Sequence, residues 1–180
     1  MSMRPLAMNA REVLDRYWSR NTPVRVPVDP IQIAKKAGLR VSASSAICVS
    51  STAPACSGQI SLEEGKGAIL YDPTAHHVRQ RFTVAHELGH YFLGHLTDGE
   101  TFFRDGPRQF STSAMLFQPK ETAANRFAAE LLVPMDTLND FIVNQRITEG
   151  YDLAIRFEVS TMVIDIRVKE WQKIRSQALV

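Results

Sequence analysis

Apolar residues recur at helical spacing near the start of the chain and predict two short packing helices. The first spans residues 7–20 and stops before an Asn-Thr-Pro sequence. The second has Asp29 as its N-cap and Pro30 at its first position, and it stops at Gly38. Each of these helices has an apolar face that needs a partner surface.

The next part of the chain predicts a small antiparallel sheet of three strands. β-Branched and alternating stretches place the strands at residues 39–42, 57–62 and 68–72, with a Gly-containing turn between the last two. An exposed edge of this sheet, at residues 68–71, could bind an extended peptide as an added strand.

The rest of the chain has a helical pattern that is interrupted by one long loop. One helix spans about residues 75–93 and ends at Gly94, and another spans residues 119–133 between two prolines. Residues 97–118 contain glycine, proline and four phenylalanines, which predict either a lid over a site or a loop pinned by its aromatic side chains. Three further helices are predicted at residues 136–147, 153–157 and 161–175, the last capped by Ser160.

Composition predicts an ordinary globular domain with a sizeable core. The 180 residues are 44% hydrophobic, and 21 basic and 19 acidic residues give a net charge of +2. Because the charges are balanced and scattered, direct binding to DNA or to an anionic membrane is not expected. The start of the chain has no apolar signal segment and no run approaches the length of a membrane span, so a cytoplasmic protein is predicted.

The predicted helix at residues 75–93 contains the sequence His-Glu-Leu-Gly-His at residues 86–90. On a helix, His86 and His90 share one face, so both imidazoles can reach a single metal ion. Glu87 is rotated by about 100° from His86, which keeps it off the metal and directs it towards a metal-bound water. Imidazole nitrogens suit Zn²⁺, and three protein ligands leave a fourth position for that water. The motif therefore predicts zinc-dependent hydrolysis with Glu87 as the general base.

Three residues could supply the third protein ligand, namely His95, Glu121 and Glu130. His95 comes one residue too early for a metzincin pattern, and a continuing helix would rotate it about 140° from His90. Glu121 shares a helical face with Asn125, one turn later. A Glu on a following helix is a common third ligand in such sites, and an amide one turn on can hold a ligand side chain in place. Glu130 lies off that face. Glu121 fits best.

Two blocks of sequence resemble the ImmA/IrrE family of zinc metallopeptidases. They are Arg-Phe-Thr-Val-Ala-His-Glu-Leu-Gly-His at residues 81–90 and Glu-Thr-Ala-Ala-Asn-Arg-Phe-Ala-Ala-Glu-Leu-Leu-Val-Pro at residues 121–134. Weaker support comes from residues 27–39, 57–60 and 153–160, so the resemblance covers most of the chain.

The resemblance implies a compact α+β gluzincin-like endopeptidase. In it, Zn²⁺ would be held by His86, His90 and Glu121, and Glu87 would be catalytic. Many members of the family cleave or otherwise inactivate helix-turn-helix repressors or related partners. The implied substrate is therefore a helix-turn-helix repressor or antitoxin-like regulator, which implies a role in transcription regulation or stress response.

We expect one metallopeptidase domain over residues 1–180, with a catalytic core at 1–135 and a C-terminal helical part at 136–180. A function of another class is a non-proteolytic module that uses the same fold to bind a transcriptional regulator or DNA. Residues 153–175 predict helix, short turn and helix with several basic side chains. Acidic residues among them, and apolar residues suited to a core, favour packing over contact with DNA.

Overall fold

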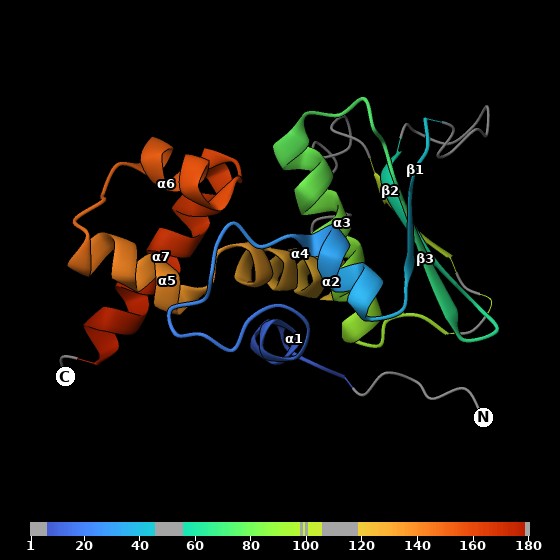
Figure 1. Cartoon of the computed structure of the whole chain (residues 1–180), viewed down its shortest axis with the longest axis horizontal. Helices are drawn as coiled ribbons and strands as arrows, with labels where there is room; N and C mark the ends of the chain where they lie inside the picture. The colour runs from blue at the N-terminus through green and yellow to red at the C-terminus, as the bar shows by residue number, and fades with distance from the viewer. Residues whose placement is uncertain (1–6, 46–55, 98, 100, 106–118, 179–180) are drawn as a thin grey trace.

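The protein is described by a computed structural model that places residues 7–45, 56–97, 99, 101–105 and 119–178. A four-stranded sheet lies at one end of the molecule, with helices α2 and α3 against it (Figure 1). Helices α1 and α4 lie next to α2 and α3, and the C-terminal helices form the other end. The helices are α1 Ala10–Tyr17, α2 Pro30–Lys36, α3 His77–Phe92, α4 Pro119–Leu132, α5 Met135–Asn139, the π-helix η2 Asp140–Asn144, α6 Gly150–Phe157 and α7 Thr161–Gln177. The strands are β1 Arg40–Ala43, β2 Cys56–Glu63, β3 Lys66–Tyr71 and β4 Thr101–Asp105.

Side-chain caps fix the starts of three helices. Asn9 and Glu12 form a capping box that starts α1 at Ala10, three residues later than predicted. The Asp29 carboxylate accepts hydrogen bonds from two backbone N–H groups of α2, and Ser160 accepts one from α7, as the sequence predicted. Caps that bond to the nearby backbone are local features, which is why the sequence indicated them.

The sheet differs from the predicted three-stranded antiparallel one. Its order is β1-β3-β2-β4, with β1 parallel to β3 and with β2 antiparallel to both β3 and β4. The fourth strand lies inside residues 97–118, the region that was predicted as a loop. Residues 98, 100 and 106–118 of that region fall outside the described part of the chain. Because β3 has a partner on each side, residues 68–71 are not an exposed edge, and that prediction is wrong.

Helix α3 is the centre of the molecule. Its apolar side chains Val84 and Leu88 are fully buried, as are Ile60 of β2 and Ile69 of β3, and these residues belong to one hydrophobic core. Because α3 packs between the sheet and α4, most of its length is screened from water, and ten of its residues are buried. Polar groups on such a helix need partners within the protein.

The buried guanidinium of Arg81 joins α3 to two other segments. It donates hydrogen bonds to the carbonyl oxygens of Val28, at 2.6 Å, and Glu158, at 3.1 Å. It also pairs with the Glu158 carboxylate at 3.2 Å, and burial lowers the pKa of Arg81. Glu158 ends α6 in the left-handed conformation, with φ 52°. Arg81 therefore fixes the α6–α7 turn against the first half of α3.

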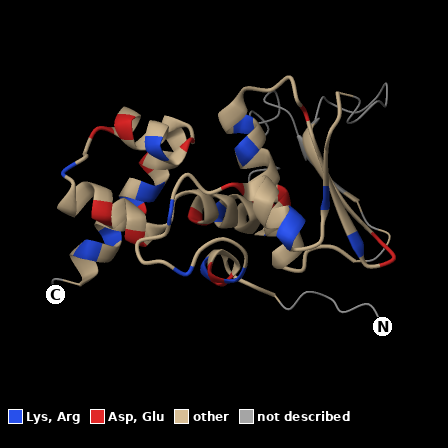
Figure 2. Ribbon diagram, in the orientation of Figure 1, with Lys and Arg blue, Asp and Glu red and all other residues tan. Residues whose placement is uncertain are grey.

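The C-terminal helices carry interspersed charges of both signs (Figure 2). Arg167 of α7, one of the basic residues in the predicted helix-turn-helix, is only 4% exposed and donates a hydrogen bond to the Val133 carbonyl oxygen at 3.1 Å. Its guanidinium also bonds to Glu170. Among the described helices, none combines the length and the apolar character that crossing a bilayer would require.

Candidate metal centre

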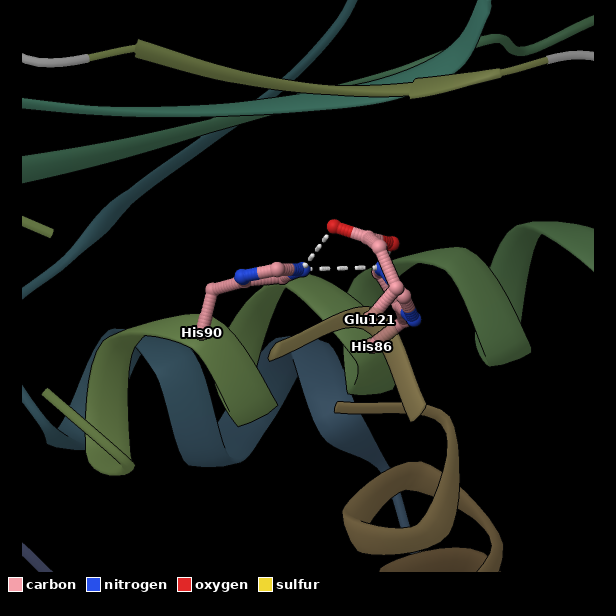
Figure 3. Close-up of side chains that lie close together, drawn as sticks. All are labelled: His86, His90 and Glu121. Atoms are coloured by element: carbon pink, nitrogen blue, oxygen red, sulfur yellow. Dashed lines mark hydrogen bonds and ion pairs between the residues drawn. The ribbon is translucent and has the colours of Figure 1, made fainter. Parts of the chain in front are cut away.

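His86 and His90 lie one turn apart on the face of α3 that packs against α4. Their side chains are buried, at 2% and 1% exposed, and their Nε2 atoms lie 3.1 Å apart. Figure 3 shows both rings turned towards the same point. This is the arrangement that the four-residue spacing predicted, because residues i and i+4 of a helix share a face.

Glu121 reaches the same point from the first turn of α4. One carboxylate oxygen lies 3.2 Å from His86 Nε2 and the other lies 3.1 Å from His90 Nε2 (Figure 3). The three side chains offer ligand atoms that all lie within 4.8 Å of one another. The structure thus brings together the three residues that the sequence singled out, and two imidazole nitrogens with a carboxylate oxygen are donors that suit a zinc ion.

The other two candidates for the third ligand do not join the group of converging donors. Glu130 lies farther along α4, away from the two imidazoles. It pairs there with Arg126, one turn before it, at 2.9 Å. His95 contacts His90 on Nδ1, the nitrogen opposite the one that faces Glu121. Neither residue belongs to the group of side chains that converge.

A close approach of two helices sets the position of Glu121. A Cβ placed on Gly89 of α3 would lie 3.0 Å from both the Cα and the carbonyl oxygen of Ala124 in α4. The two backbones therefore touch at this point, and any side chain on Gly89 would push α4 away. Since Glu121 lies about one turn before Ala124, this contact brings its carboxylate within reach of the imidazoles.

The two histidines lower the pKa of the Glu121 carboxyl group. Burial would raise the pKa of Glu121, but hydrogen bonds and charge interactions with His86 and His90 outweigh burial and hold that pKa well below its usual range. The carboxylate is thus negatively charged at neutral pH and faces two bases. A cation placed between them would be attracted by all three groups.

Asn125 orients one of the two imidazoles from outside the cluster. Its Oδ1 lies 3.0 Å from His86 Nδ1, so it can accept the proton of that nitrogen and leave Nε2 unprotonated. Asn125 follows Glu121 by four residues, and the sequence predicted that an amide at this position would hold a ligand side chain. The contact agrees with that prediction.

Glu87 is buried, at 1% exposed, and lies on the side of α3 that faces the sheet. A Cβ placed on Gly58 of β2 would lie 3.0 Å from Glu87 Oε1 and would overlap the methyl group of Thr83. The strand therefore packs its bare backbone against the carboxylate. Sequence reasoning missed this role of Gly58, although a glycine inside a strand is a known sign of close approach by another group.

His95 lies closer to the cluster than the helical rotation predicted. The helix ends at Phe92, and Gly94, with φ 69°, turns the chain so that the His95 N–H donates to the His90 carbonyl oxygen at 3.0 Å. The His95 ring then packs against His90 rather than facing away. Burial lowers the pKa of His95, and the charges of His90 and Lys120 act in the same direction.

Comparison with known families agrees with this site. Residues 35–169, about three quarters of the chain, match the family model described as the IrrE N-terminal-like domain, a peptidase family designated M78. The match includes all of α3 and α4, and therefore every residue of the cluster. The chain matches no curated protein.

Proposed function

The chain belongs to the ImmA/IrrE family of metallopeptidases, and on this premise we propose that it is a zinc-dependent endopeptidase that cleaves a helix-turn-helix repressor or antitoxin-like regulator. The observation that carries the proposal is the convergence of His86, His90 and Glu121 within 4.8 Å, next in sequence to the buried carboxylate of Glu87. The class of substrate comes from the family resemblance, and the class of reaction comes from the site.

Zinc fits the three donors. His86 and His90 would hold it through Nε2 and Glu121 through its carboxylate, and three protein ligands leave one position open. When bound, zinc polarises a peptide carbonyl and lowers the pKa of a water to about 7. The chain contributes the orientation of the donors, through Asn125 on His86 and through the contact between α3 and α4.

Glu87 is the proposed general base. It takes a proton from the attacking water and passes it to the nitrogen of the leaving amine, so the peptide bond breaks and a carboxylate and an amine form. Its neighbours support this role, because the backbone at Gly58 leaves the carboxylate no room to turn further into the sheet. A confined carboxylate loses less orientational freedom during the reaction than a mobile one.

A substrate in extended form could pair with the edge of the sheet. The sheet passes over the three side chains (Figure 3), and in the described order β1-β3-β2-β4 the strand β4 is an edge. Backbone pairing with an edge strand binds peptides of many sequences, which suits a peptidase that recognises its partner through other surfaces. In this proposal β4 takes the role that the sequence assigned to residues 68–71.

The Glu87→Gln variant tests the proposal. The change keeps the shape of the side chain and removes the base, so one equivalent of zinc should remain bound while hydrolysis falls by about 10²- to 10⁴-fold. The substrate to use is a helix-turn-helix regulator encoded beside this chain, with fragments identified by mass spectrometry. Equal cleavage by the variant would show that Glu87 is not the base.

A non-proteolytic binding module is the second candidate function. Large apolar side chains are exposed on the C-terminal helices, including Tyr151 at 71% and Met162 at 71%, and such residues favour a protein partner over DNA. If the zinc-loaded protein binds the regulator and leaves it intact, this second function replaces the first.

A further inference from the structure

The two nitrogens of the His90 ring face different partners. Nε2 lies 3.1 Å from Glu121 and 3.1 Å from His86 Nε2, whereas Nδ1 lies 3.2 Å from Nδ1 of His95. We propose that His95 is a positioning residue that sets which nitrogen of His90 carries the proton. The inference uses the metal site of the proposed function, but it does not require that the protein cleave a peptide.

The chain holds His95 in place by its backbone on two sides. The His95 N–H donates to the His90 carbonyl oxygen at 3.0 Å, and the His95 carbonyl oxygen accepts a hydrogen bond from the Lys120 ammonium group at 3.1 Å. The His95 ring meets His90 edge-on, with centroids 5.1 Å apart and planes at 72°. An imidazole fixed in this way can offer one nitrogen to His90 in a constant direction.

Two ring nitrogens at hydrogen-bonding distance share one proton. His90 can bind a cation through Nε2 only if that nitrogen is unprotonated, which places the proton of a neutral ring on Nδ1. His95 Nδ1 must then accept that proton, so the proton of His95 itself lies on its Nε2. Metal binding therefore requires a definite tautomer of both rings.

Without a metal, the opposite pair of tautomers suits the contacts. His90 Nε2–H can donate to the Glu121 carboxylate, and His95 Nδ1–H can donate to His90 Nδ1. On metal binding, the proton on His90 Nε2 passes to solvent, the proton on His95 Nδ1 moves to His90 Nδ1, and a solvent proton arrives at His95 Nε2. Both rings stay neutral throughout, so the protons balance.

His86 has a different kind of partner. The Asn125 Oδ1 on its Nδ1 is only an acceptor, so His86 can bind a metal through Nε2 while its proton stays on Nδ1. His95 can accept or donate, and it therefore permits His90 to change tautomer. The two histidines of the motif therefore differ in the partner of Nδ1, which is an amide oxygen for His86 and a second imidazole for His90.

Two substitutions separate this role from simple packing. His95→Phe keeps an aromatic ring and removes the acceptor, whereas His95→Gln supplies an amide oxygen that can accept from His90. The matched control is His76→Phe, at an exposed position whose side chain makes no cap hydrogen bond to α3. Zinc affinity of the full chain is measured by competition with a chromophoric chelator, after removal of bound metal.

We expect His95→Phe to weaken zinc binding by about 10- to 100-fold, which is the usual effect of removing a partner that orients a metal ligand. His95→Gln should stay within a few-fold of the wild type, and His76→Phe should be unchanged. In the wild type, ¹⁵N NMR of labelled histidine should show the His95 proton move from Nδ1 to Nε2 when zinc is added.

Four outcomes would overturn the proposal. They are wild-type affinity in His95→Phe, equal loss in His95→Gln and His95→Phe, failure of His95→Phe to bind zinc at any concentration, and unchanged His95 tautomers in the wild type. The third outcome would make His95 a ligand. The NMR measurement decides the question even if a variant fails to fold. A wild-type protein that shows the tautomer change and cleaves nothing would contradict only the proposed peptidase activity.

Discussion

Helix α3 carries two clusters of buried polar side chains that differ in how their charges are satisfied. At its first turns, the Arg81 guanidinium is surrounded by acceptors, namely three carbonyl oxygens and the Glu158 carboxylate. Farther along, His86 and His90 face the carboxylate of Glu121, so three possible metal ligands meet at one point. The first cluster contains its own cation, and the second has the donors for one. Because both clusters are buried, burial alone does not separate a structural cluster from a binding site, but the inventory of donors and acceptors does.

The largest effect should come from removing the carboxylate of the second cluster. Glu121→Ala leaves two imidazoles to hold the ion, so zinc affinity should fall by more than the roughly 100-fold that changes around a ligand produce. The fold should survive, because the charge that is removed faces a ligand position. Zinc stoichiometry and circular dichroism measure the two effects.

Glu130→Ala is the matched control for that change. It removes a carboxylate from the same helix, one that pairs with Arg126 instead of the histidines, and it should leave zinc bound. His95→Ala should also keep zinc at saturating concentration. If His95→Ala empties the site while Glu121→Ala stays full, the assignment of ligands is wrong and a metzincin-like set replaces it.

Removing the cation of the first cluster should lower the stability of the fold and leave zinc binding unchanged. Arg81→Met leaves the Val28 and Glu158 carbonyl oxygens without their donor, and it should cost about 2–3 kcal/mol in the free energy of unfolding. Zinc stoichiometry at saturation should not change. Urea unfolding measures the loss, and Arg79→Met, on the same helix, should change stability by less than about 0.5 kcal/mol. A drop in zinc stoichiometry would show that the two clusters are coupled.

The smallest effect should come from the anion that Arg81 contacts. Glu158 has φ 52°, a conformation that favours glycine, and its side chain is 40% exposed in the ion pair. Glu158→Gly loses a weak pair and relieves the backbone, so the net change should stay within about 1 kcal/mol. Glu158→Ala loses the pair and keeps the strain, so it should be about 1 kcal/mol less stable than Glu158→Gly. Equal stability in the two variants, by urea unfolding, would show that the strain is absent.

Some features of this molecule follow from local sequence and others do not. The convergence of His86 and His90 follows from helical periodicity, and the cap at Asp29 follows from side chains that bond to the nearest backbone. The approach of Glu121 depends on Gly89 lying against Ala124, which neither segment shows by itself. The helical face that Glu121 shares with Asn125 indicated which side of α4 faces the site. It did not indicate how closely α4 approaches α3.

The three predicted strands are present, but their predicted pairing and number were wrong, because strand partners are chosen across the fold. The pairing of β1 with β3 is parallel and skips β2 in the sequence, whereas local patterns favour pairing of neighbours. Strand β4 follows Gly99 and was hidden by loop-forming residues around it. His95 was placed by continuing the helix, but Gly94 ends that rotation with a left-handed residue.

The contact of Gly89 with Ala124 also bears on which ions can enter. Three backbone or Cβ atoms of Ala124 lie within 3.3 Å of the position that a Cβ on Gly89 would take, so no change of side-chain rotamer can widen the gap between the helices. A calcium ion needs about six to eight oxygen ligands at about 2.3–2.6 Å, whereas the cluster between these helices offers two imidazole nitrogens and one carboxylate. We therefore expect the helix pair, whose separation is set by contact between main chains, to favour small ions of low coordination number over large ones.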